Sequence, residues 1–327
     1  MSQSIEILLL LALPASGKSE VRRYLASLTP AQCRDDMHLG PTAQLDDYPY
    51  VHMMRRVSQE LRQRNSDGVF FDSDELPLKE QLDWGTLIEL LNEDYDDLVN
   101  RRRAAPASAG EWLLDRYDAA RRKVGADPAF GKLPPALRRE LVAAIEAEAQ
   151  ALVRDKNTGI PDSLEGGTVV FEFARGGPDG ATPPLPKPLG YQYSVSRLSD
   201  AILRRARILY VWVTPEESRR KNTERTDPND PGSILHHGVP MAVMLGDYGC
   251  DDMEWLIQDS GRPDMVKVAK ESGAPFYLPV ARFDNRVDKT TFVRADKAQW
   301  KPADIQALHQ GLAGALAKLA ELSPARG

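Results

Sequence analysis

One stretch near the start of the chain constrains its fold more than any other. Residues 5–13 form a mostly apolar run, and Gly17, Lys18 and Ser19 then open a helical pattern after a short turn that contains Pro14. This order of strand, turn and helix, with a Gly-Lys-Ser triplet where the helix begins, is typical of a phosphate-binding loop. We therefore expect backbone N–H groups of the turn and the N-terminus of the helix to bind nucleotide phosphates.

The loop assigns roles to consecutive residues. Lys18 would reach the outer phosphates, and Ser19 would offer its hydroxyl to Mg²⁺. The other expected nucleotide-binding positions are Pro14, Ala15, Ser16, Gly17 and Glu20. The pattern asks for glycine where this chain has Ala12, and Ala15 stands where many kinase loops carry glycine. Alanine is costly at such a position only if the backbone there has a positive φ.

The composition is that of a soluble globular protein. The 327 residues are 42% hydrophobic and 28% charged, which supplies enough apolar matter for a core. The net charge of −6 gives no electrostatic reason to expect a nucleic-acid partner or a membrane surface. The first apolar run is too short to span a bilayer and lacks the basic leader of a signal peptide. Cys33 and Cys250 belong to no metal or redox motif, so we expect reduced thiols and a cytoplasmic location.

The order of the predicted elements indicates an α/β fold with a mostly parallel sheet, because strands alternate with helices from end to end. We expect a three-layer sandwich whose core holds residues 1–100 and 161–327. Residues 101–160 are alanine-rich and charged, with apolar residues at helical spacing, and they predict a helical insertion beside the core. A lid is expected within the core at residues 215–240.

Residue propensities and turn residues set the individual elements. Besides the first strand, apolar runs predict strands at 69–72, 168–173, 208–213 and 275–285. Helical patterns are assigned to residues 20–28, 51–64, 82–91, 111–123, 137–154, 191–205, 253–257, 265–270 and 304–322. Residues 33–50 are expected to be rich in loops, because Asp, Gly and Pro recur there.

Carboxylates follow several of these segments. Asp46 and Asp47 precede a pair of tyrosines after the first helix, and a carboxylate there could take the proton from an attacking hydroxyl or hold the metal. The alternative is an Asp-rich surface turn. Asp72 ends the strand predicted at 69–72, and it could serve the metal or the acceptor, since ligands sit at the carboxyl ends of strands.

Glu172 interrupts the dense apolar run at 168–173, and Arg175 follows it. A carboxylate inside an apolar strand is costly unless it has a partner. Glu172 is therefore predicted to meet the Mg²⁺ shell or an acceptor hydroxyl, and Arg175 is predicted to clamp an anionic or hydroxyl group. The alternative is an edge strand on which Glu172 faces water.

A basic helix follows the strand at 208–213. Thr214 and Pro215 form a capping signal, so the helix start is well marked. Arg219, Arg220 and Arg225 lie on this helix, and such arginines could stabilise the charge on a transferring phosphoryl group. The alternative is a surface helix held together by pairing between Arg220 and Glu224.

These motifs resemble those of known families. Residues 12–19, Ala-Leu-Pro-Ala-Ser-Gly-Lys-Ser, look like the loop of P-loop nucleoside and nucleotide kinases. Residues 45–48 are similar to the strand-end Asp-aromatic signal of the uridine kinase and phosphoribulokinase group, and residues 71–72 with 83–84 echo that group. Glu172 and Arg175 are similar to the Glu-Arg pair of deoxynucleoside kinases. Residues 284–285 resemble the Asn-bearing strand end near the adenine in such kinases. The resemblance implies a P-loop sandwich.

Three functions compete at this point. The first is ATP-dependent phosphoryl transfer, with Mg²⁺, to a small-molecule acceptor such as a nucleoside, a nucleotide, a sugar, or a sugar nucleotide as in zeta-toxin-like kinases. The second is a P-loop ATPase or a GTPase-like regulatory switch, although the guanine-reading sequence Asn-Lys-x-Asp does not occur in the chain. The third is a non-catalytic nucleotide-binding module. The sequence indicates neither the acceptor nor the oligomeric state.

Overall fold

A seven-stranded β-sheet forms the centre of the molecule. The structure is a computed structural model that describes residues 4–225 and 238–327. Its strands are β1 (Ile7–Leu11), β2 (Thr42–Asp46), β3 (Thr168–Phe173), β4 (Ala206–Trp212), β5 (Met265–Val268), β6 (Phe276–Asp284) and β7 (Ala325–Arg326). They lie in the order β2-β3-β1-β4-β6-β5, and β7 also pairs with β6. The first five strands of this order are parallel, and β5 and β7 run antiparallel to β6. The prediction of an α/β fold with a mostly parallel sheet is confirmed.

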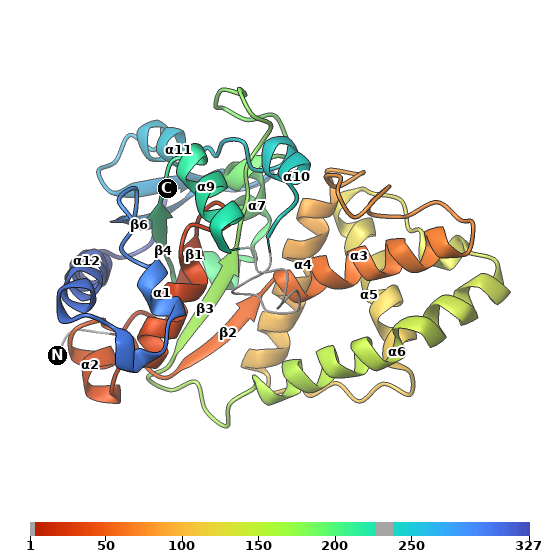
Figure 1. Cartoon of the computed structure of the whole chain (residues 1–327), viewed down its shortest axis with the longest axis horizontal. Helices are drawn as coiled ribbons and strands as arrows, with labels where there is room; N and C mark the ends of the chain where they lie inside the picture. Colours follow the sequence, from red (N-terminus) through yellow and green to blue (C-terminus); the bar gives the residue numbers. More distant parts are fainter. Residues whose placement is uncertain (1–3, 226–237) are drawn as a thin grey trace.

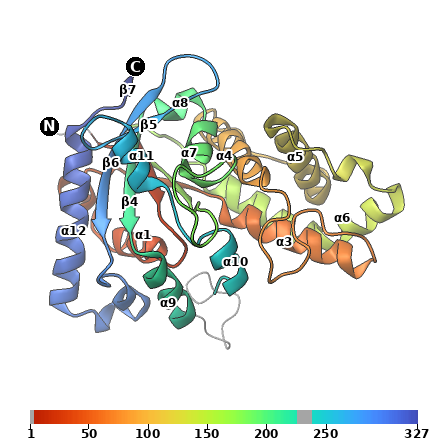
Figure 2. The same cartoon turned by 90° about the horizontal axis from the view of Figure 1, so that it is seen from above.

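Helices cover both faces of this sheet (Figures 1 and 2). They are α1 (Lys18–Ala26), α2 (Pro30–Asp35), α3 (Tyr48–Gln63), α4 (Asp83–Val99), α5 (Ala109–Val124), α6 (Pro135–Thr158), α7 (Gly190–Arg197), α8 (Asp200–Leu203), α9 (Pro215–Arg225), α10 (Met241–Gly246), α11 (Met253–Asp259) and α12 (Pro302–Glu321), with short 3-10 turns at Phe130–Lys132, Thr291–Arg294 and Lys297–Gln299. None of the helices in the described ranges is both long enough and apolar enough to cross a membrane.

The alternation of side chains along β1 explains the two helical layers. Leu8 and Leu10 pack in one buried cluster with Val21 of α1 and Leu312 of α12. Leu9 and its neighbours at positions 7 and 11 point the other way, into a cluster with residues of α4 and α7. Because successive side chains of a strand face opposite sides of the sheet, a strand that is apolar throughout must be covered on both faces.

The helices α3, α4, α5 and α6 pack together beside the sheet (Figure 1). The Tyr117 hydroxyl of α5 donates a hydrogen bond to the Tyr50 carbonyl of α3 (2.8 Å), and Lys156 of α6 forms an ion pair with Asp94 of α4 (2.7 Å). The two helices from the 101–160 segment therefore share one core with two helices that precede that segment.

Two predicted elements are wrong. The strand expected at 69–72 is an irregular segment, because the N–H groups of Phe70 and Phe71 donate to the Ser58 hydroxyl of α3 (3.0 and 3.2 Å) rather than to another strand. The helix expected at 265–270 is instead strand β5, whose Val266 and Val268 are buried while the residue between them is not. The 33–50 segment, expected to be rich in loops, contains the end of α2, the whole of β2 and the start of α3.

The strand order places the end of β1 at a crossing point of the fold. The chain leaves β1 towards β2 and β3 on one side, and later adds β4 and β6 on the other side. In open sheets of this kind, ligands bind outside the carboxyl ends of the strands where the order reverses. A ligand site is therefore expected at the loop after β1 and the ends of β2 and β3.

Candidate functional site

The loop at residues 12–17 connects β1 to α1. Gly17 has a φ of 104°, and a Cβ atom there would lie 2.5 Å from the Thr290 hydroxyl, so the position requires glycine. Ala15 also has a positive φ, 55°, and therefore carries strain that glycine would not. Ala12 is fully buried and is not among the described residues with positive φ. Of the two departures from the glycine pattern, only Ala15 thus has a conformational cost.

Lys18, at the first position of α1, folds back over the loop. Its ammonium donates hydrogen bonds to the carbonyls of Ala12 (3.0 Å) and Leu13 (3.4 Å), and its side chain is nearly buried. The Ser16 hydroxyl donates to the Leu13 carbonyl (2.6 Å). These bonds fix the loop as a compact turn in which Lys18 lies beside the N-terminus of α1, where the helix dipole favours anions.

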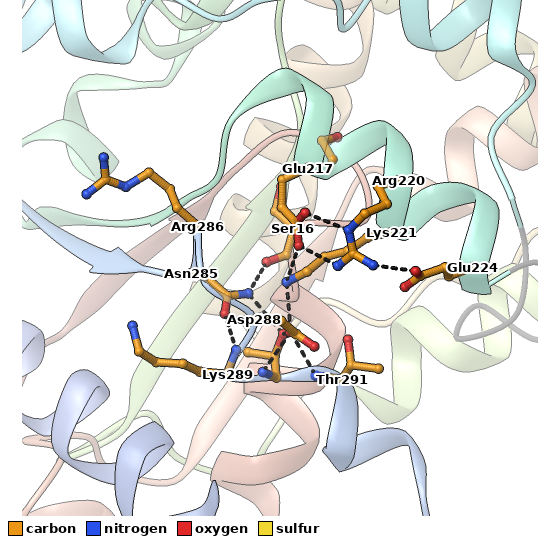
Figure 3. Close-up of polar contacts among 12 residues, drawn as sticks. Ser16, Glu217, Arg220, Lys221, Glu224, Asn285, Arg286, Asp288, Lys289 and Thr291 are labelled. Atoms are coloured by element: carbon orange, nitrogen blue, oxygen red, sulfur yellow. Dashed lines mark hydrogen bonds and ion pairs between the residues drawn. The ribbon is translucent and has the colours of Figure 1, made fainter.

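The segment that follows β6 contacts the loop and supports it (Figure 3). Asn285 is fully buried, and its amide nitrogen donates to the Ser16 carbonyl (2.8 Å) and to the Thr290 hydroxyl (2.9 Å). From α9, the Ser218 hydroxyl donates to the Pro14 carbonyl (2.7 Å). Two elements from the C-terminal half of the chain therefore set the shape of the loop.

Three carboxylates gather at the ends of β2 and β3. Asp46 and Glu172 are direct neighbours in the register of these strands, and Asp47 is the first residue after β2. One nitrogen of Arg22 binds both Asp46 (3.1 Å) and Glu172 (2.7 Å). Because β3 lies between β2 and β1, the alternative in which Glu172 sits on an edge strand is wrong.

The sequence did not single out Arg22, although a signal for it exists. It lies four residues after Lys18, so both side chains are on one face of α1. That face is directed at the ends of β2 and β3, as the two ion pairs of Arg22 show. A basic residue one turn after the Gly-Lys-Ser triplet was therefore a readable candidate for pairing with strand-end carboxylates.

Burial and crowding perturb these acids. Burial, with the negative charges of Glu172 and Asp47, raises the pKa of Asp46 to about 7, against the opposing effect of the Tyr48 N–H and Arg22. Burial also raises the pKa of Asp47, and Arg175 opposes that shift. Carboxylates whose pKa is displaced by burial and by like charges are characteristic of functional sites.

Arg175 positions Asp47. Its guanidinium is almost completely buried, and it binds the Asp47 carboxylate (2.6 Å) and the Ser194 hydroxyl (2.9 Å). It also stacks against the rings of Trp84 and Phe173. The clamp predicted for Arg175 is therefore directed at Asp47, and Arg175 is not among the described residues that line the cavity beside it.

That cavity has a volume of about 150 Å³ and lies between the loop and the ends of β2 and β3. Its walls bring together every predicted loop position from Pro14 to Glu20 with Asp46, Asp47 and Glu172. It is also lined by residues that the sequence did not nominate, namely Tyr48, Val51, Arg55, Phe173, Ala174, Val239, Pro240, Val243 and Tyr248. The structure thus joins the phosphate-binding candidates and the acidic candidates in one space.

Other predicted site residues lie elsewhere. Asp72 is largely exposed and forms an ion pair with Lys79 (2.8 Å), so it contributes nothing to the described cavity walls. Arg220 is held by Glu217 (2.6 Å) and Glu224 on its own helix, which is the arrangement of the surface-helix alternative (Figure 3). The side chain of Arg225 and residues 226–237 of the predicted lid lie outside the described residues.

The Lys221 side chain of α9 is almost completely buried, and no sequence motif predicted this burial. Its ammonium forms an ion pair with Asp288 (2.8 Å), whose carboxylate also accepts the N–H groups of Thr290 and Thr291 (Figure 3). Lys221 therefore joins α9 to the segment that supports the loop at 12–17.

The oxygen atoms of the cavity fit a partial Mg²⁺ site. Ser19 offers a hydroxyl and Glu172 a carboxylate, which are the hard ligands that Mg²⁺ prefers. No group of three or more His, Cys, Asp or Glu side chains in the described part of the chain is arranged as a metal site. This is compatible with Mg²⁺, which is commonly held by one or two protein oxygens together with substrate phosphates and water.

Comparison with known proteins identified no relative of this chain. No family model matches this chain, and neither the curated proteins nor the solved structures contain a match.

Proposed function

We propose that this chain is a P-loop kinase-like enzyme that transfers the terminal phosphoryl group of a nucleoside triphosphate to a small-molecule acceptor. One observation carries the proposal: a single cavity is lined by Lys18 and Ser19 and also by Asp46, Asp47 and Glu172. Phosphate-binding groups and proton-accepting groups must face the same space if a phosphoryl group is to pass between two bound molecules.

The chain's own residues divide the work as follows. Lys18 and the N–H groups at the start of α1 bind the triphosphate. Asp46 accepts the proton of the acceptor hydroxyl while that oxygen bonds to the terminal phosphorus and the bond to the leaving diphosphate breaks. The raised pKa of Asp46 suits a base that operates near neutral pH. Asp47, fixed by Arg175, orients the acceptor.

Ser19 and Glu172 would hold Mg²⁺, which when bound would offset the negative charge of the phosphates. Arg22 holds Glu172 and Asp46 at a fixed separation, so both carboxylates keep their place at the cavity wall.

An acceptor distinguishes this proposal from an ATPase, from a nucleotide-driven switch and from a non-catalytic module. A hydrolytic switch needs only to position water, whereas three clustered carboxylates beside a cavity that Val51, Phe173 and Val243 also line suit a second substrate.

ATP and GTP are both candidates for the nucleotide donor. Residues 285–288 read Asn-Arg-Val-Asp, which differs from the guanine-reading sequence Asn-Lys-x-Asp only by Arg286 in place of lysine. Asn285 contacts the loop directly, so this segment lies beside the proposed phosphate site. Both nucleotides therefore belong in the first assay.

The test is nucleotide consumption by the purified chain with Mg²⁺, alone and with a panel of nucleosides, nucleotides, sugars and sugar phosphates. We expect at least one acceptor to stimulate consumption, and we expect Lys18→Ala to abolish the stimulation. Phosphorylated acceptor should appear in equal amount to the diphosphate released.

Consumption that no acceptor changes would favour the ATPase or switch. Binding without any consumption would favour the non-catalytic module. A protein that binds neither ATP nor GTP would refute the assignment of the loop itself.

A further inference from the structure

Arg55 is a cation on the cavity wall that forms no ion pair with a carboxylate of the described residues. It lies on α3, lines the same cavity as Lys18 and Asp47, and is half-buried. One of its nitrogens donates to the Asp74 carbonyl (2.8 Å), and its guanidinium lies over the Phe71 ring, 4.0 Å from the centroid. These two contacts fix the side chain and leave it without an ion pair to any residue of the described ranges.

The other arginines near the site are compensated. Arg22 binds Asp46 and Glu172, and Arg175 binds Asp47. Arg62, on the same helix as Arg55, binds the Asp74 carboxylate (2.6 Å). A half-buried charge at a cavity wall is costly without a counter-charge, so the position is suited to an anion supplied by a ligand.

The surroundings of Arg55 support this interpretation. Burial lowers the pKa of Arg55 from its usual value, and the nearby Tyr248, Asp74, Asp247 and Glu75 oppose the shift only in part. Of these acids, Asp74 is engaged by Arg62, and Asp247 accepts the Leu78 N–H (3.3 Å).

The spacing along α3 limits the size of such a ligand. Asp47 directly precedes the first residue of the helix and Arg55 follows eight residues later, about 12 Å along the axis, with side chains leaning back towards the N-terminus. A ligand whose hydroxyl lies at Asp46 and whose anion lies at Arg55 must therefore be larger than phosphate or a two-carbon acid.

We propose that Arg55 binds an anionic group of the acceptor, so that the substrate is a hydroxyl-bearing phosphate or carboxylate of the size of a sugar phosphate, a sugar acid or a nucleotide. This proposal rests on the phosphotransferase function proposed above. Arginine suits the role because its planar guanidinium can bind a carboxylate or a phosphate with two parallel hydrogen bonds.

The test uses matched neutral and anionic compounds: glucose, glucose 6-phosphate and glucuronate, and uridine with uridine monophosphate. Each is added to the full chain saturated with Mg²⁺ and a non-hydrolysable ATP or GTP analogue, and ligand binding is read from the melting temperature. Each is then tested as an acceptor with the hydrolysable nucleotide. The phosphate and carboxylate members separate the two sources of the anion.

Three variants complete the experiment. Arg55→Gln should reduce kcat/KM and affinity for the anionic acceptor at least about tenfold, since a hydrogen-bonded charge contributes about 1.5–3 kcal/mol. Arg55→Lys should have an intermediate affinity for the anionic acceptor, because lysine keeps the positive charge but lacks the planar guanidinium that makes two parallel hydrogen bonds. Arg56→Gln removes the same charge from the same helix at a position that pairs with Glu60 (2.8 Å) and Glu148 (2.9 Å) and does not line the cavity, so it should leave acceptor affinity unchanged.

A neutral compound that binds as well as its anionic partner would overturn the role of Arg55, and so would equal losses in Arg55→Gln and Arg56→Gln. A panel in which no anion binds would also count against it. A neutral acceptor whose phosphorylation depends on Lys18 would leave the kinase proposal standing. Anion binding that requires Arg55, without any turnover, would instead support the site while refuting the kinase.

Discussion

Asp46 and Asp47 are adjacent in the chain, yet their contacts predict different consequences of mutation. Asp46 shares Arg22 with Glu172, so Asp46→Asn leaves the arginine paired. We expect Asp46→Asn to lower acceptor-dependent turnover at least about 100-fold, the usual contribution of a general base. Its free energy of unfolding, measured with urea, should stay within about 1 kcal/mol of the parent.

Asp47→Ala should instead lower stability, because it leaves the buried Arg175 without its carboxylate partner. We expect a loss of about 3 kcal/mol in the free energy of unfolding. An Asp46→Asn variant with full turnover would remove Asp46 from the mechanism. Unchanged stability in Asp47→Ala would show that the buried pair contributes little.

At the same scale, the sequence nominated Lys18 from the Gly-Lys-Ser triplet after an apolar run, Asp46 from an acidic pair before two tyrosines, and Glu172 from its place inside an apolar run. It could not nominate Arg55, whose role depends on which face of α3 lines the cavity. Arg220 was a reasonable candidate by charge, but the position of acidic residues three residues before it and four after it already predicted pairing along the helix.

The two alanines of the loop offer a second prediction. Ala15→Gly relieves a left-handed conformation that costs an L-residue about 1–2 kcal/mol, against an entropic cost of about 0.4–1 kcal/mol in the unfolded chain. We expect its free energy of unfolding to rise by up to about 1 kcal/mol. Ala12→Gly relieves nothing and removes a buried methyl group, so its stability should fall by about 1 kcal/mol. Urea unfolding of both variants measures the contrast, and a stability gain in Ala12→Gly would contradict it.

At the scale of elements, strands inside the sheet could be predicted and isolated apolar runs could not. The runs at 168–173 and 208–213 became β3 and β4 because continuous apolar side chains are covered on both faces. The run at 69–72 has similar residues, but Phe70 and Phe71 are buried among helices, and their N–H groups bind Ser58. Local propensity does not distinguish these outcomes, since tertiary contacts decide where an aromatic run is buried.

An interaction between two helices gives the prediction at this scale. Glu146 of α6 accepts hydrogen bonds from the Gly110 N–H (2.8 Å), the Ala109 N–H (2.9 Å) and the Ser108 hydroxyl (2.8 Å), and so caps the N-terminus of α5. Burial alone would raise the pKa of Glu146, but these bonds lower it to about 2, from 4.5. The ionised carboxylate therefore stabilises the fold above pH 4.5, and that contribution is lost as the pH falls towards 2.

Glu146→Gln should accordingly lower the free energy of unfolding by about 2 kcal/mol at neutral pH. The difference between the parent and the variant should shrink as the pH is lowered below 4.5. Urea unfolding at a series of pH values measures both effects. Glu140→Gln, at an exposed position of the same helix, serves as the control. A difference that is independent of pH would show that the charge of Glu146 is not what caps α5.

At the scale of the whole molecule, the alternation of strands and helices was enough to predict the α/β class. It did not predict that α3 and α4 belong to the same core as α5 and α6, because a helical pattern shows which face is apolar and not what covers it. Their contacts bear on the 101–160 segment, which the sequence presented as an insertion. Removal of a true insertion leaves the rest of the protein folded, whereas removal of half of a shared core does not.

Replacing residues 101–160 by a flexible Gly/Ser linker tests this. The deletion would expose large side chains of α3 and α4, including Met54, Leu61 and Leu87. It would also leave the buried Asp94 without its two cations, Arg116 (2.8 Å) and Lys156 (2.7 Å). At about 2 kcal/mol for each exposed side chain, six or more would cancel the roughly 5–15 kcal/mol that stabilises a typical domain.

We therefore expect the shortened chain to lack a cooperative thermal transition by circular dichroism, and to lose nucleotide binding because α3 carries a wall of the cavity. Supplying residues 101–160 as a separate chain should restore part of both signals, since the missing contacts are the same whether or not the backbone is continuous. A shortened chain that melts cooperatively near the temperature of the parent would show instead that α3 and α4 are stable on the sheet alone, and that the 101–160 segment is a separable insertion.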